Sequence, residues 1–124
     1  MFLHSLYEIE RALSSPGELK ADLKIRPDHP LYAGHFPGHP VTPGVVLTEI
    51  VKELIESRVE KRLVMVQLRQ VKFLAAHDPV AVPTISVVVN WTDEPESIVQ
   101  ASASAGELTY FKLSAVYRLS DTVL

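Results

Sequence analysis

One segment of this chain, residues 43–58, has the pattern of a long helix, and it lies among stretches that alternate like β-strands. Its apolar residues recur at helical spacing and fill one half of the helical wheel: Val46, Leu47, Ile50, Val51, Leu54 and Ile55. Thr42 is expected to cap this helix, with Pro43 at its first position, where proline is favoured. A single amphipathic helix must bury its apolar face against the rest of the chain, and this requirement limits the fold.

The remaining segments predict β-strands. Residues 18–26 alternate between apolar and charged side chains, which is the pattern of a half-buried strand. The turn sequence Ser14-Ser15-Pro16-Gly17 joins this strand to residues 1–13, whose pattern fits either a strand or a short helix. We expect further strands at residues 62–74, 84–91, 97–105 and 108–119, with a tight hairpin at Gly106-Glu107.

The predicted order is two strands, the helix and four more strands, which places the chain in the α+β class. We expect one domain covering residues 1–124. One helix covers only part of a sheet face, so free strand edges and uncovered apolar surface favour dimerisation.

Composition and charge exclude several classes of protein. The formal net charge is −3, and no run of Lys and Arg exceeds two residues, so neither a nucleic-acid partner nor binding to a membrane surface is expected. The chain has no cysteine, which excludes disulfides, zinc sites built on cysteine and thiol nucleophiles. No apolar run approaches the length of a membrane span and no leader pattern is visible, so we expect a cytoplasmic location.

A loop rich in Gly and Pro, residues 27–42, leads directly into the helix and carries three histidines. The spacing of His29, His35 and His39 matches no trusted pattern of metal ligands, so no metal is expected. A structural interpretation is that the imidazoles of His35 and His39 bind carbonyl groups of the loop. No role is predicted for His39, or for His77 and Trp91 further along the chain.

Glu49, on the predicted helix, has two interpretations. In the first it belongs to a solvated stripe with Glu53 and Glu56, where Lys52 forms ion pairs with Glu49 and Glu56. In the second it forms an acid–base pair with His35, which the prolines of the loop hold in place.

The second interpretation includes a site for a carbonyl group. The backbone N–H of Gly44, at the positive end of the helix dipole, would polarise that carbonyl. A base, an acid and a polarised carbonyl between them are the groups needed to add or remove water next to a thioester.

The run GHFPGHPVTPGVVLTE, residues 34–49, resembles the signature of the bacterial 3-hydroxyacyl-acyl-carrier-protein dehydratases. The family pattern is G-H-F-P-G-x-P, then P-G-V, with a Glu fourteen residues after the His, and His35 and Glu49 stand at this separation. Weaker similarity extends to residues 28–32 and 71–73. The resemblance implies a hot-dog fold, in which an antiparallel β-sheet wraps around one central α-helix.

The resemblance also implies an activity, the dehydration of (3R)-hydroxyacyl thioesters to trans-2-enoyl thioesters in fatty-acid or related acyl biosynthesis. The acyl group would be carried on acyl carrier protein or coenzyme A, and no cofactor or metal is implied. His35 would take the proton from C2 and Glu49 would protonate the leaving 3-hydroxyl. The N–H of Gly44 would polarise the thioester carbonyl, and apolar residues would line the acyl site: Phe36, Val45, Val46 and Phe73.

In this family each site takes its His and its Glu from different subunits. The resemblance therefore implies a homodimer or a higher even oligomer with shared active sites, in which the acyl chain lies in a tunnel at the interface. Three departures indicate a divergent branch. First, Glu53 replaces a usual Gln, and this second carboxylate near Glu49 is expected to raise the proton affinity of one of the two. Second, the basic residues that would dock an acidic carrier are reduced to Lys72 and nearby Arg69. Third, the usual N-terminal helix is missing.

Two alternatives to a dehydratase are considered. A hot-dog thioesterase would use Glu49 to activate water, but it would not need the His-Phe-Pro-Gly run, because hydrolysis requires no base at C2. A non-catalytic acyl-binding partner subunit would keep the fold without turnover, and Glu53 and the reduced basic patch favour it.

Overall fold

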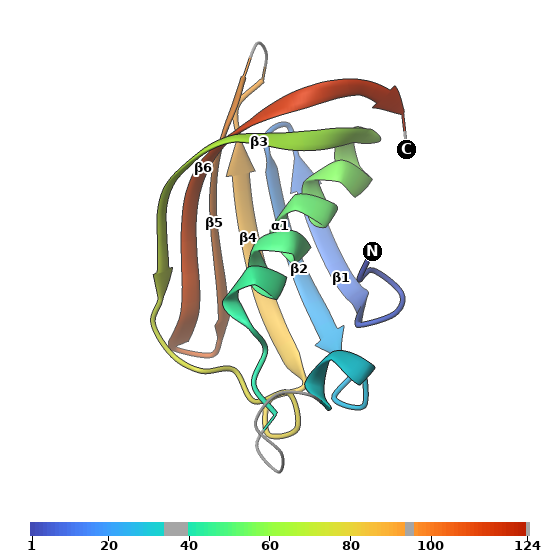
Figure 1. Cartoon of the computed structure of the whole chain (residues 1–124), viewed down its shortest axis with the longest axis vertical. Coiled ribbons are helices and arrows are strands. Elements are labelled where there is room, and N and C mark those ends of the chain that lie inside the picture. The colour runs from blue at the N-terminus through green and yellow to red at the C-terminus, as the bar shows by residue number, and fades with distance from the viewer. Residues whose placement is uncertain (34–39, 94–95, 124) are drawn as a thin grey trace.

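Figure 1 shows the computed structural model of the chain, in which a curved sheet wraps around one helix. The structure describes residues 1–33, 40–93 and 96–123, and the side chains of residues 121–123 are not described. The elements are β1 (Tyr7–Ser15), β2 (Glu18–Ile25), the 3-10 helix η1 (Pro30–Tyr32), α1 (Gly44–Val59), β3 (Lys61–Phe73), β4 (Thr84–Trp91), β5 (Ser97–Ala105) and β6 (Leu108–Val123).

The six strands form one antiparallel sheet in the order β1-β2-β4-β5-β6-β3. This confirms the predicted element order, and it settles the ambiguous first segment, which forms the edge strand β1. The sheet curls around α1, and the apolar half of the predicted helical wheel is buried against it. On β2 the alternating apolar residues are likewise buried: Leu19, Ala21, Leu23 and Ile25.

Two glycines make the predicted turns possible. Gly17, between β1 and β2, has φ +73°, and a Cβ there would lie 2.7 Å from the carbonyl oxygen of Trp91. Gly106, between β5 and β6, has φ +58°. Other residues rarely adopt this conformation, so glycine at these two positions fixes both hairpins.

The start of α1 differs from the sequence prediction. Pro43 is the N-cap, with φ −61° and ψ 145°, and no side chain caps the helix. The expectation that Thr42 would cap α1 is therefore wrong, because its hydroxyl has buried partners elsewhere. The helix ends at Val59, and the left-handed backbone of its C-cap, Glu60, turns the chain directly into β3.

Strand β3 lies at the edge of the sheet opposite β1, and much of its apolar surface is exposed. Register pairs Phe73 with Phe111 and Met65 with Tyr117, so these residues of β3 share the face of the sheet that carries the core. They remain 60% and 40% exposed at this edge of the sheet. Figure 1 shows the first part of β3 and the last part of β6 extending over the C-terminal half of α1.

No helix in the described part of the chain has both the length and the apolar character needed to cross a membrane.

Candidate functional site

The structure describes part of the predicted site. Gly44, Val45 and Glu49 lie in the first two turns of α1, and Phe73 ends β3. His35 and Phe36 lie outside the described residues, as does His39, so the pairing of His35 with Glu49 stays a prediction.

Gly44 lies against the ring of Phe73. A Cβ at Gly44 would overlap this ring, so glycine at this position lets the ring of Phe73 lie against the start of α1. Phe73 also stacks on the buried Phe111, with 5.9 Å between the ring centroids. Phe73 is 60% exposed and Val45 is 74% exposed. Three of the residues predicted to bind substrate thus give the N-terminus of α1 an apolar surface.

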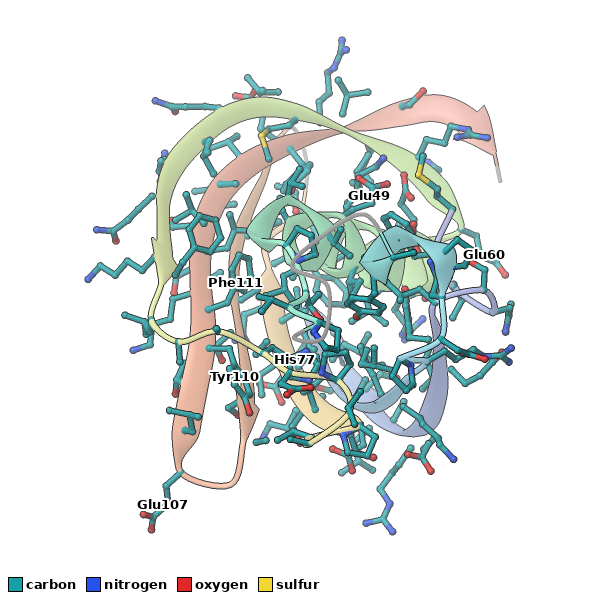
Figure 2. The ribbon with its side chains drawn as sticks, turned by 60° about the horizontal axis from the view of Figure 1, so that its bottom comes forward. Glu49, Glu60, His77, Glu107, Tyr110 and Phe111 are labelled. Carbon is teal, nitrogen blue, oxygen red and sulfur yellow. The ribbon has the colours of Figure 1, made fainter. Side chains whose placement is uncertain are left out.

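Glu49 lies on the part of α1 that faces the overhanging strands, as Figure 2 shows. Its carboxylate accepts a hydrogen bond from the Lys52 ammonium, with 3.2 Å between Nζ and Oε1. The two side chains are 27% and 29% exposed. Ion pairs with this exposure contribute less than about 1 kcal/mol, so Glu49 can change its partner at little cost.

Glu53, one turn further along α1, is buried and binds the N-terminal segment. Its carboxylate accepts the N–H of Phe2 at 2.9 Å, the N–H of Leu3 at 2.9 Å and the hydroxyl of Tyr7 at 3.1 Å. The amine of Met1 lies 3.0 Å away. These bonds tie the first residues of the chain to the helix.

The charge of Glu53 follows from these partners. Burial acts to raise its pKa, but the hydrogen bonds from Phe2, the N-terminal amine and Leu3 outweigh burial and hold the pKa below its usual value. Glu53 is therefore an ionised structural carboxylate. The expectation that Glu53 belongs to a solvated stripe is wrong. Of the two neighbouring carboxylates, one of which was expected to gain proton affinity, Glu53 is not that one, because its pKa is lowered.

Glu56 has a structural role of a similar kind. It is 7% exposed and accepts the N–H of Leu63 at 2.8 Å, which holds the start of β3 against the helix. The solvated position predicted for Glu56 is wrong for this reason, and Lys52 pairs with Glu49. Glu53 and Glu56 thus bind backbone N–H groups, whereas the one described interaction of the Glu49 carboxylate is a weak ion pair.

A chain of buried hydrogen bonds lies at the base of the loop that precedes α1. The hydroxyl of Tyr32 lies 2.8 Å from Oγ1 of Thr42, which lies 2.7 Å from Nδ1 of His77. Nε2 of His77 lies 2.7 Å from the carbonyl oxygen of Val82. The N–H of Thr42 also donates to the carbonyl of His77 at 2.9 Å. This clamp joins Tyr32 to Thr42, which precede and follow residues 34–39 in the chain.

The partners of His77 define its tautomer. A carbonyl accepts only, so Nε2 carries the proton and Nδ1 accepts the Thr42 hydroxyl. Burial lowers the pKa of His77, although its bond to Val82 and the nearby charge of Asp78 oppose that effect. Figure 2 shows His77 and Glu49 on different sides of α1, so His77 belongs to the clamp and not to the Glu49 side of the helix.

We expect Thr42→Val to lower the free energy of unfolding by about 2 kcal/mol, because it leaves the Tyr32 hydroxyl and Nδ1 of His77 buried without their partner. Urea unfolding at pH 7.5 measures the effect. Thr42→Ser is the matched control, since it keeps the hydroxyl, and it should retain most of the stability. An unchanged stability in Thr42→Val would show that the hydrogen bonds of the Thr42 hydroxyl do not stabilise the fold.

The architecture described above, an antiparallel sheet wrapped around one helix, is the hot-dog fold, which confirms the predicted fold class. The chain belongs to the ApeI-like family, since the family model described as ApeI dehydratase matches residues 11–109. This finding supports the resemblance to hot-dog dehydratases.

Solved structures agree with this fold. One is described as the dehydratase heterocomplex ApeI:P from Xenorhabdus doucetiae, with 17% identity and a TM-score of 0.73, covering 90% of this chain and 97% of that chain. Another is an uncharacterized protein from Erwinia carotovora, with 18% identity, a TM-score of 0.60 and coverage of 93% and 94%. A thioesterase superfamily protein from Shewanella loihica has 11% identity, a TM-score of 0.57 and coverage of 95% and 93%. Among curated proteins, none matches this chain.

Proposed function

We propose that this protein dehydrates (3R)-hydroxyacyl thioesters to trans-2-enoyl thioesters, with His35 as the base and Glu49 as the acid. The observation that carries the proposal is the position of Glu49. It lies in the second turn of α1, beyond the exposed apolar residues Val45 and Phe73, and it binds no backbone group among the described residues. Membership of the ApeI-like family supports the same reaction class.

The reaction balances without a cofactor. The imidazole of His35 takes the proton from C2, the electron pair of that bond forms the double bond between C2 and C3, and the bond between C3 and oxygen breaks. The carboxyl group of Glu49 gives its proton to the leaving oxygen, which departs as water. Each acid–base contribution of this kind is typically worth about 10²–10⁴-fold in rate. A proton must pass from His35 back to Glu49 before the next turnover.

The start of α1 supplies the group that makes C2 acidic. The first N–H groups of a helix have no acceptor within the helix, and that of Gly44 is one of them. In this proposal it donates to the thioester carbonyl and stabilises the negative charge that develops there. The apolar surface of Val45 and Phe73 would bind the acyl chain, each buried methylene contributing about 0.8 kcal/mol.

The carrier would dock beside this surface. Lys72 and Arg69, the two cations near the end of β3, are both exposed. In this proposal they bind an acidic carrier protein or the phosphates of coenzyme A, so the enoyl product would pass to fatty-acid or related acyl biosynthesis.

A second copy of the chain is the proposed partner along β3. Pairing centred on Gln67 would place Arg62 of one copy opposite Lys72 of the other, and like charges cost only a few tenths of a kcal/mol. Burial of an apolar side chain gains about 1.5–3 kcal/mol. Burial of the exposed apolar residues of β3 would therefore outweigh the repulsion between these charges and favour the dimer: Val64, Met65, Val66, Leu68 and Phe73.

We therefore expect the purified protein to have twice the mass of one chain, or a higher even multiple, in sedimentation equilibrium. A monomer would contradict self-pairing and would favour a different hot-dog chain as the partner, one with an acidic edge strand.

The function is tested with (3R)-hydroxybutyryl and longer (3R)-hydroxyacyl thioesters on both carriers. Absorbance of the conjugated enoyl thioester in the ultraviolet should rise, with no release of free thiol. Thiol release would support the alternative thioesterase. Absence of turnover with every substrate would favour a non-catalytic acyl-binding subunit and would contradict the proposal.

A further inference from the structure

Two buried tyrosines lie near the carboxylates of α1, and their hydroxyl groups differ in one respect. Tyr7 is fully buried, and its hydroxyl donates to Glu53 at 3.1 Å. Tyr117 is 1% exposed, and its hydroxyl has no hydrogen-bond partner. Among the described residues it is the one buried side-chain polar atom left without a partner.

An unpaired buried hydroxyl is unfavourable, because the group has lost its water without gaining another partner. Buried polar groups are nearly always paired in folded proteins, and the exceptions concentrate where a function requires them. Phenylalanine would fill the same space without this cost. The hydroxyl of Tyr117 therefore points to a partner that is present only in another state of the site.

The position of Tyr117 shows which groups surround it. It lies on β6, paired with Met65 of β3 and Ser97 of β5. Its pKa is raised to about 12, first by burial and then by the charges of Glu49 and Glu56. Tyr117 thus keeps its proton at neutral pH and is available as a hydrogen-bond donor near these two carboxylates.

Two of the three carboxylates on this side of α1 already have firm partners. Glu53 accepts two backbone N–H groups and the Tyr7 hydroxyl, and Glu56 accepts the N–H of Leu63. Among the described residues, the Glu49 carboxylate binds Lys52 alone, through a partly exposed ion pair. Glu49 is therefore the acceptor that can move.

We propose that Tyr117 is a positioning residue for Glu49, whose carboxyl group leaves Lys52 when substrate binds and accepts a hydrogen bond from the Tyr117 hydroxyl. The inference rests on the proposed dehydration. In that arrangement the O–H of the protonated Glu49 points to the leaving 3-hydroxyl, while its carbonyl oxygen accepts the proton of Tyr117. Tyr117 keeps its own proton throughout.

The test compares Tyr117→Phe with Tyr7→Phe, which removes the same atom from the second buried tyrosine near the carboxylates of α1. Tyr117→Phe should lower kcat about tenfold or more with little change in KM, because it removes a hydrogen bond made to the acid. Its Tm should be equal to or above that of the wild type, since an unpaired donor is removed. Tyr7→Phe should show the opposite result, a lower Tm with kcat unchanged for the folded enzyme.

A double-mutant cycle links the effect to Glu49. In a Glu49→Gln background, Tyr117→Phe should cause no further loss of kcat, because the group it positions no longer acts as an acid. An unchanged kcat in Tyr117→Phe, or an equal further loss in the Glu49→Gln background, would overturn the inference while the dehydratase activity stands. If the wild type forms no enoyl thioester, the proposed function itself fails, and the inference fails with it.

Discussion

Glu49→Gln is expected to reduce the rate of enoyl-thioester formation by about 100-fold or more, because the amide cannot donate the proton that the leaving hydroxyl requires. The fold should not change, since the one described hydrogen bond of the Glu49 carboxylate is the weak one from Lys52. Initial rates of absorbance change and thermal unfolding of the same sample measure the two effects. His35→Ala should cause a loss of similar size through removal of the base.

Lys52→Met is the matched control for Glu49→Gln. It breaks the same ion pair but leaves the carboxyl group in place, so most of the activity should remain. A loss as large as that of Glu49→Gln would mean that the ion pair itself is required. Full activity in Glu49→Gln would remove Glu49 from the mechanism.

Glu53→Ala should lower the free energy of unfolding by about 3 kcal/mol. The substitution leaves the Tyr7 hydroxyl and the N–H groups of Phe2 and Leu3 without their acceptor, and buried groups of this kind cost about 1–3 kcal/mol each. Urea unfolding monitored by circular dichroism measures the loss. Glu49→Ala, one turn earlier on the same helix, is the control and should change stability by less than about 1 kcal/mol.

The pH dependence of stability tests the same carboxylate. The pKa of Glu53 is lower in the folded protein than its ordinary value of 4.5. Its stabilising contribution is therefore complete above pH 4.5 and is lost as the pH falls below that value toward the folded pKa. Glu53→Ala should accordingly show a smaller loss of stability on acidification than the wild type. An identical pH dependence in both proteins would contradict the ionised structural role.

The fold was predictable from the sequence because its elements have clear periodicity. Alternation in β2 and helical spacing in α1 mark the side chains that become buried, and Gly17 and Gly106 mark the hairpins. These signals are local: each depends on residues close together in the chain. The ends of elements were less predictable, as the start of α1 shows.

The partners of single polar residues were not predictable, because they lie far away in the sequence. On a helical wheel Glu53 belongs to the polar face, yet it is buried and accepts the N–H groups of Phe2 and Leu3, about fifty positions earlier. His77 stands alone after an apolar run, and no local pattern links it to Thr42, 35 positions away. Tertiary contacts therefore give Glu53 and His77 structural roles that their positions in the sequence do not indicate.

In the candidate site, too, the local pattern was predictable from the sequence and the distant contacts were not. The motif places Gly44, Val45 and Glu49 at fixed steps along one helix, and the structure adds the contact of Gly44 with Phe73. Tyr117 carries no motif, and only its burial without a partner draws attention to it. The meeting of His35 with Glu49 stays a prediction.

The most direct test of the central claim uses a heterodimer of His35→Ala and Glu49→Gln subunits, co-expressed with different tags and purified on both. If each site takes its base from one subunit and its acid from the other, one of the two sites in this heterodimer is intact, and about half of the wild-type specific activity should return. Both parent homodimers should show about one hundredth of the wild-type activity or less. A heterodimer as inactive as its parents would contradict a dehydratase site shared between two chains.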